Sequence, residues 1–444
     1  YSSEFKKLVS DFKQQYLDGN DIEAKESLED AITFYENNSN KINNKKAWQI
    51  FITSGKKLAR KDDNDLAIAL FKLSVKVGDE DQTMESKFQH LFTYYNERQF
   101  DSALEYIKRE KLLEDFSELS SKLQYWIAKI TLERKEYKQA KEMFKTLIAT
   151  KPLSFYAILS LKELRKVSNN YGTNLLINEE PLSHKHLKLS DRAFHALSLF
   201  HIFNEVESNL LSSIQATEIR KIPSTQFFSN IPAEQSATYK AYYLIRFFSE
   251  NQNHLSSFKI AYTAFKKNTI KLNPLVISSL FPRKFTDLLK KHNDKLDHNV
   301  VLSLIRQESA FNTKATSVVG ARGLMQIMPA TGRQFKRRLK DWQLYNPELN
   351  IKIGTKYLTN LVDRYEGNLV FSLASYNAGI GNVSRWLKSI PFGNDMVANI
   401  EMIPFKETRN YVTLIYRNIF FYNYMDGKND FIDLPINDSF VARL

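Results

Sequence analysis

Residues 317–329 read Ser-Val-Val-Gly-Ala-Arg-Gly-Leu-Met-Gln-Ile-Met-Pro, and this stretch decides what the last third of the chain can be. Two glycines three positions apart, Gly320 and Gly323, let the backbone turn tightly and approach another group closely. Gln326 stands alone among Leu, Met and Ile, so its amide should be hydrogen-bonded or face a cleft. Pro329 suits the first turn of a new helix. The stretch predicts a functional loop, although the methionines could simply fill a core.

An apolar helix precedes this loop and is expected to end near Ala310 and Phe311. Glu308 follows Leu304 by one turn, so it lies beside the apolar stripe of that helix rather than opposite it. A carboxyl group at the edge of a buried face has a raised pKa, which suits a general acid at neutral pH. The alternative is a surface glutamate paired with Arg306 or Lys314.

Two more motifs follow in the chain. The first runs Ala-Ser-Tyr-Asn-Ala-Gly-Ile-Gly-Asn-Val over 374–383, and the second runs Glu-Met-Ile-Pro-Phe-Lys-Glu-Thr-Arg-Asn-Tyr-Val over 401–412. Together with Arg306-Gln-Glu-Ser-Ala-Phe311 and residues 320–329, they resemble the catalytic domain of soluble lytic transglycosylases. These enzymes belong to glycoside hydrolase family 23 and have a goose-lysozyme-like fold. The four motifs occur in the family's order across about 110 residues.

The resemblance implies a role for each matching position. Glu308 matches the catalytic acid/base. Ser317, Gln326 and Met328 match residues that line the sugar subsites. Tyr376 and Asn377 match the floor of the cleft beside the acid, and Glu407 and Tyr411 match the opposite wall, where sugar or peptide groups of the substrate are held. Ile380-Gly381 departs from relatives that carry a proline after Gly379, which is expected to alter only the stiffness of the loop.

The implied reaction needs one carboxyl group, whereas most glycosidases use two. Glu308 would protonate the glycosidic oxygen between N-acetylmuramic acid and N-acetylglucosamine. It would then take the proton of the muramic acid C6 hydroxyl, which closes on C1 as a 1,6-anhydro ring. Two alternatives stay open: a goose-type lysozyme that hydrolyses the same bond with water, and a non-catalytic helical scaffold that binds glycan.

The first part of the chain repeats. An alanine is followed four positions later by a large apolar residue at Ala31/Tyr35, Ala67/Phe71, Ala103/Ile107 and Ala140/Phe144, with a period near 36 residues. Such a period is typical of helix-pair solenoids. Only four of the 13 glycines precede residue 300, which also favours long helices there.

Prolines at 274 and 282 interrupt the helical pattern, so we expect two domains: a superhelical domain over 1–280, with repeats at 20–150, and a catalytic domain over 281–444. The predicted fold is therefore mainly α, a superhelix of helix pairs followed by a goose-lysozyme-like domain with at most a small β-hairpin.

Composition limits the partners. The formal net charge is +13, which favours polyanions such as peptidoglycan strands with their stem-peptide carboxylates. No nucleic-acid-binding motif is present. The chain has no cysteine, so disulfides and thiolate metal sites are excluded, and we expect no lipid anchor on cysteine. His184, His186 and His195 show no metal-ligand arrangement, so we expect no metal and no cofactor. We expect a periplasmic monomer whose signal peptide has been removed before Tyr1, with room for peripheral association with the outer membrane or cell-wall machinery.

Overall fold

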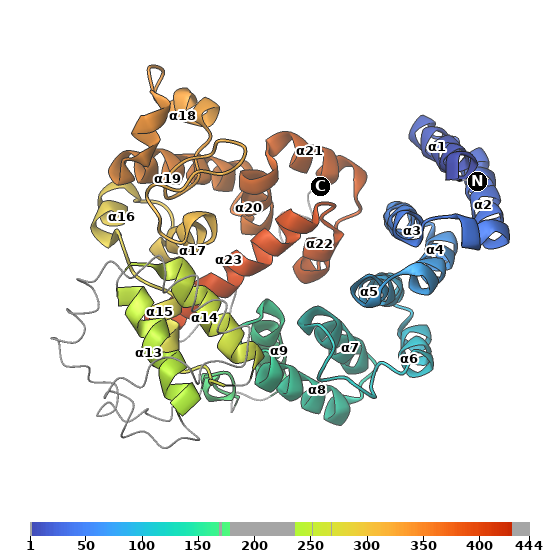
Figure 1. The fold of residues 1–444 in the computed structure, drawn as a ribbon, viewed down its shortest axis with the longest axis horizontal. Coiled ribbons are helices and arrows are strands. Elements are labelled where there is room, and N and C mark those ends of the chain that lie inside the picture. The colour runs from blue at the N-terminus through green and yellow to red at the C-terminus, as the bar shows by residue number, and fades with distance from the viewer. Residues whose placement is uncertain (1, 168–170, 178–235, 251, 268, 429–444) are drawn as a thin grey trace. The chain divides into compact units, whose positions relative to one another are not determined.

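The computed structural model describes residues 2–167, 171–177, 236–250, 252–267 and 269–428 (Figure 1). Helices make up nearly all of the regular structure in these ranges. The extended pairing consists of two isolated antiparallel bridges, Thr316 with Arg322 and Arg322 with Ile327. None of the helices in the described ranges is long and apolar enough to cross a membrane. The predicted mainly α fold is confirmed.

The chain forms two compact units, residues 1–140 with 387–392 and residues 141–386 with 393–444. This division does not follow the predicted domain boundary near residue 280, which stays a prediction. The helices of the first unit are α1 (Ser2–Asp18), α2 (Asp21–Asn38), η1 (Ser39–Lys41), α3 (Asn44–Ala59), α4 (Asn64–Val77), α5 (Glu80–Asn96), α6 (Phe100–Arg109) and α7 (Ser121–Glu133), and α8 (Tyr137–Thr150) begins within it.

The repeated alanine motif marks every second helix. Its four copies lie on α2, α4, α6 and α8, and each alanine is at most 1% exposed. Helices pack in sequence order, α1 on α2, α3 on α4, α4 on α5 and α5 on α6. A small residue lets neighbouring helices approach, and the large residue one turn later fills the space between them. The predicted series of helix pairs is therefore confirmed.

The second unit contains the remaining helices: α9 (Phe155–Val167), η2 (Thr173–Leu175), α13 (Ser236–Glu250), α14 (His254–Lys266), α15 (Pro274–Leu280), α16 (Thr286–His292), α17 (His298–Ser309), α18 (Pro329–Phe335), η5 (Asp341–Tyr345), α19 (Pro347–Arg364), α20 (Leu369–Ala378), α21 (Ile380–Ser389), which includes three residues of the first unit, α22 (Met396–Met402) and α23 (Lys406–Met425). Figure 1 shows α9, α17, α20 and α22 around α23, and all four contact it.

Helix α17 begins at a side-chain cap and ends in a left-handed turn. The Asp297 side chain caps its start by accepting a hydrogen bond from the Asn299 amide. Ala310, with φ of 48°, ends the helix in the left-handed region, and Phe311 follows with φ of 65°. The helix ends within two residues of the predicted point and leaves Glu308 in its last turn.

Arg306 anchors α17 to the rest of the unit. Its Nε donates to the Leu280 carbonyl at 2.6 Å and a terminal nitrogen donates to Asn418 Oδ1 on α23 at 3.1 Å. The guanidinium also lies over the rings of Phe258 and Phe281. The alternative in which Arg306 pairs with Glu308 is therefore wrong, because this arginine is committed to the interior of the unit.

Candidate active site

Glu308 meets Tyr411 in the second unit. Tyr411 extends from α23 and its hydroxyl donates to Oε1 of Glu308 at 2.5 Å. Glu308 is half-buried, and Tyr411 is 6% exposed. No ion pair engages Glu308 anywhere in the described ranges, so the alternative pairing with Lys314 is also not formed.

The surroundings favour the protonated form of Glu308. Burial raises its pKa to about 7, the Tyr411 hydrogen bond opposes that rise, and the charge of Glu407 adds to it. Burial also raises the pKa of Tyr411 well above its usual value, so its hydroxyl stays a donor at neutral pH. A carboxyl group with a pKa near the working pH can both give and take a proton.

Helix α23 supplies two of the predicted residues from one face. Glu407 and Tyr411 are four positions apart, so they project on the same side of the helix. Glu407 is exposed, and its charge acts on Glu308. Thr408 donates a hydrogen bond of 2.6 Å to Asn377 Oδ1 at the end of α20. The two motifs that are farthest along the chain are thereby tied together beside the acid.

Tyr376 lies next to Glu308 and also holds the preceding loop. Its hydroxyl donates to the Met325 carbonyl at 2.8 Å, and its ring packs against Tyr357 of α19 with the ring centres 5.3 Å apart. Burial, followed by the charge of Glu308, raises the pKa of Tyr376 well above its usual range. Tyr376 therefore positions the loop that carries Met325 and Gln326.

Gln326 is engaged by the loop itself. Its side-chain nitrogen donates to the carbonyls of Gly323 at 2.8 Å and Ala315 at 3.2 Å, and its backbone is left-handed, with φ of 47°. Of the two possibilities the sequence left open, a paired amide and one facing a cleft, the paired amide is present. This pairing shapes the loop between α17 and α18.

Ser317 and Met328 lie at the two ends of the same loop. Ser317 closes a turn by accepting a hydrogen bond from the Ala321 amide at 3.0 Å. Met328 is 39% exposed and precedes Pro329, which begins α18 as predicted. Among the described residues, no hydrogen bond links Ser317, Gln326 or Met328 to Glu308, so any shared role with the acid depends on a ligand.

Asn350 is a positioning residue that the sequence did not reveal. It is fully buried on α19, its Oδ1 accepts from the Met325 amide at 2.8 Å, and its Nδ2 donates to the carbonyls of Arg322 and Leu344 at 2.9 and 2.8 Å. A lone asparagine in the apolar pattern Leu349-Asn350-Ile351 was the available signal, since a buried amide must find partners.

Gly323 explains why this loop needs glycine. Its φ is 76°, and a Cβ there would lie 2.3 Å from the Leu344 carbonyl oxygen and 2.4 Å from Asn350 Nδ2. Gly320 also has a positive φ, 87°, but open space surrounds it. The close approach predicted for the two glycines therefore holds at Gly323 alone.

No metal site is formed in the part of the chain that the structure describes, where no three His, Asp or Glu side chains are grouped to hold an ion. His184, His186 and His195 lie outside the described residues.

A known protein-family model matches the region of the chain that contains Glu308. Residues 289–396 match the family model for the transglycosylase SLT domain. The chain is 40% identical over 155 residues to the soluble lytic murein transglycosylase of Escherichia coli and 39% identical over 158 residues to that of Salmonella typhimurium. These matches cover 33% and 34% of this chain but only 24% of each relative. The chain thus spans about a quarter of the curated relatives it matches.

Solved structures resemble a larger part of this chain than the curated relatives do. The lytic transglycosylase Slt of Pseudomonas aeruginosa matches with a TM-score of 0.64 and 22% identity, covering 92% of this chain and 62% of that one. The 70 kDa soluble lytic transglycosylase of E. coli matches with a TM-score of 0.51 and 22% identity, covering 98% and 71%. A complex of the 70 kDa soluble lytic transglycosylase with bulgecin A matches with a TM-score of 0.51 and 20% identity, covering 97% of this chain and 81% of that one. Residues 289–396 thus carry a transglycosylase SLT domain.

Proposed function

We propose that this chain is a peptidoglycan lytic transglycosylase in which Glu308 is the only acid/base. The observation that carries the proposal is the hydrogen bond from Tyr411 to a half-buried carboxyl group whose pKa is raised to about 7. The relatives named soluble lytic murein transglycosylase support the substrate class. The P. aeruginosa enzyme, whose inactive form is a glutamate-to-glutamine mutant, supports the need for one glutamate.

In the first step, Glu308 gives its proton to the oxygen that joins C1 of N-acetylmuramic acid to N-acetylglucosamine. The C1–O bond breaks, the N-acetylglucosamine leaves with the proton, and positive charge develops at C1. The Glu308 carboxylate remains beside that charge and stabilises it. The Tyr411 hydroxyl keeps the carboxyl group oriented and, by favouring the charged form, helps it to lose the proton.

In the second step, the C6 hydroxyl oxygen of the same muramic acid attacks C1 and its proton passes to Glu308. The product carries a 1,6-anhydro ring and the acid is restored, so water is neither consumed nor released. Because the nucleophile belongs to the substrate, its effective concentration can reach roughly 10⁵ M. In this proposal the remaining predicted residues, Ser317, Gln326, Met328, Tyr376, Asn377, Glu407 and Tyr411, hold the sugars and stem peptides around Glu308.

Glu407 favours a second candidate, hydrolysis. Its exposed carboxylate acts on Glu308 through its charge, so it is the group that would activate a water molecule in a goose-type lysozyme. We prefer the transglycosylase because relatives that are 40% and 39% identical carry that name. A cell-wall substrate also implies a periplasmic enzyme; that location and a monomeric state stay predictions.

The test is digestion of purified cell-wall sacculi in heavy-oxygen water, with the products read by mass spectrometry. A transglycosylase releases anhydro products that are lighter by one water, contain no heavy oxygen and resist borohydride reduction. Glu308→Gln should release no product and Glu407→Gln should still form the anhydro ring. Heavy oxygen at new reducing ends would establish hydrolysis instead. Product release by Glu308→Gln at the parent's rate would assign the acid to another residue, and a parent that releases no product would indicate a glycan-binding scaffold.

A further inference from the structure

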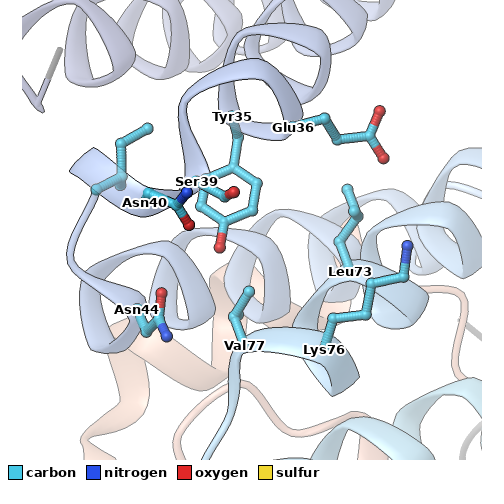
Figure 2. A pocket seen from close by; sticks show the side chains of 9 residues that line it. Tyr35, Glu36, Ser39, Asn40, Asn44, Leu73, Lys76 and Val77 are labelled. Carbon is cyan, nitrogen blue, oxygen red and sulfur yellow. The ribbon is translucent and has the colours of Figure 1, made fainter.

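A cavity of about 810 Å³ opens in the first unit, and none of the residues that line it has a place in the proposed reaction. Its walls are the end of α2, the short helix η1, the start of α3 and the end of α4. Figure 2 shows Tyr35 near its centre, with Asn40 and Asn44 on one side and Glu36 and Lys76 on the other. Cavities of this size commonly hold small ligands or short peptide segments.

The neutral polar groups that line this cavity are uncommitted. The Tyr35 hydroxyl and the side chains of Ser39, Asn40 and Asn44 form no hydrogen bond with any other described residue. Tyr35 is buried and Ser39 is half-buried, and such polar groups normally find partners, whereas Asn40 and Asn44 are exposed. The four come from two helices and the segment between them and line the same space, so a ligand that carries amide groups can bond to them together.

The charged groups lie at the opposite end of the cavity. Glu36 and Lys76 are both exposed, come from α2 and α4, and form no ion pair with each other or with another described residue. Figure 2 shows both charged ends on the same side of the cavity, near Leu73. One free carboxylate beside one free ammonium matches a ligand that carries the opposite two charges close together.

The floor of the cavity favours a peptide over a sugar. Sugars are usually held against the open face of an aromatic ring, but Tyr35 is 5% exposed and its ring is packed between Phe51 and Phe5, with ring centres 5.0 and 5.8 Å away. The rest of the floor is aliphatic and buried, including Leu73 and Val77. Aliphatic side chains suit the methyl groups of alanine, and the free amides suit peptide bonds.

We propose that this cavity binds the stem peptide of peptidoglycan, with Glu36 holding the ammonium and Lys76 the carboxylate at the end of a diaminopimelate side chain. The inference rests on the proposed function for its substrate. It adds a second contact with the cell wall, made by the N-terminal helical unit and independent of Glu308. A stem peptide with lysine at this position lacks the carboxylate, so Lys76 gives the cavity a means of telling the two apart.

The test is isothermal titration of the full chain carrying Glu308→Gln with two free tetrapeptides that differ only in having diaminopimelate or lysine as the third residue. We expect the diaminopimelate peptide to bind more tightly by up to about fivefold, the upper end of what one exposed ion pair supplies. Glu36→Gln and Lys76→Met should each weaken its binding by roughly the same factor. Tyr35→Phe, which keeps the ring and removes the hydroxyl, should also weaken it.

Matched controls are Glu29→Gln on α2 and Lys72→Met on α4, which change the same charges at exposed positions outside the cavity. Both should bind like the parent. Equal binding of the two peptides, or binding that Glu36→Gln and Lys76→Met leave unchanged, would overturn the inference. The titration involves no glycan cleavage, so the two proposals can fail separately. Peptide binding without anhydro products would contradict only the proposed function. Anhydro products without peptide binding would contradict only this inference.

Discussion

The Tyr411 hydroxyl and the Glu308 carboxyl group, 103 positions apart in sequence, share a hydrogen bond of 2.5 Å. This contact opposes two influences that raise the pKa of Glu308, burial and the charge of Glu407. The balance leaves the carboxyl group close to half-protonated at neutral pH. A group in that state can serve as the acid of one step and the base of the next, so the pair is the part of the site whose chemistry is most open to measurement.

Removing the Tyr411 hydroxyl should move the pH profile. The parent's kcat/KM should fall as pH rises above about 7, because the first step needs protonated Glu308. Tyr411→Phe should shift this fall to higher pH, since the lost hydrogen bond favoured the charged form, and should slow cleavage by roughly tenfold or more. The measurement is kcat/KM for a soluble muropeptide from pH 5 to 9.

Tyr422→Phe is the matched control for that change. It removes a buried hydroxyl from the same helix, one that donates to the Pro282 carbonyl at 3.0 Å. It should lower stability and leave the pH at which activity falls unchanged. If Tyr411→Phe and the parent had identical pH profiles, the ionisation that lowers activity above pH 7 would not be that of Glu308.

Glu308 should make the protein less stable as pH rises. The folded state keeps its proton up to about pH 7, whereas the unfolded chain loses it near the usual pKa of 4.5. The folded state therefore binds more protons between these values, and the free energy of unfolding should fall across this window by at most about 3 kcal/mol. Glu308→Gln should melt at a higher temperature than the parent at pH 8 and at a similar temperature at pH 4. Calorimetry at both values checks this, and a parent that is the more stable of the two at pH 8 would contradict it.

The two loop glycines should differ in their tolerance of alanine. Gly323→Ala forces a Cβ to within 2.3 Å of the Leu344 carbonyl, so it should cost several kcal/mol or prevent the second unit from folding. Gly320→Ala meets open space and carries only the strain of its positive φ, about 1 kcal/mol. Thermal melting of the two variants compares them directly. Equal melting temperatures would show that the loop moves aside at no cost.

Asn350 should affect catalysis without touching the reacting groups. Asn350→Ala leaves the Met325 amide and the Leu344 carbonyl without their partner, while the Arg322 carbonyl keeps its hydrogen bond from the Ile327 amide, so the change should cost roughly 2 kcal/mol or more. Because the loop carries Gln326, kcat should be lower than in the parent. The pH above which activity declines should stay near 7. Asn360→Ala removes an exposed asparagine from the same helix and should behave like the parent. Unchanged kcat and stability in Asn350→Ala would show that the loop holds its shape unaided.

Local sequence patterns predicted the helices well, because the formation of a helix depends on residues that are close together in the chain. The start of α18 at Pro329 follows from the backbone preference of proline, whereas α17 ends at Ala310 in the left-handed region, which alanine disfavours. The alanine period predicted which helices alternate, since burial at one turn's spacing is a property of the helix itself. The partner of Gln326 was left open, because a lone amide in an apolar run has the same sequence signal whether it meets a backbone carbonyl or a cleft.

By itself, the sequence determined the helical character of the chain, the loop after α17 and the choice of Glu308 as the residue to examine. Only the tertiary structure decided that Tyr411, rather than Arg306 or Lys314, meets this carboxyl group, and that Asn350 holds the loop beside it. The physical reason is that helix formation and turn geometry depend on residues a few positions apart. A pKa depends on every group within a few ångströms, and those groups are brought together from α17, α20 and α23 only when the helices pack.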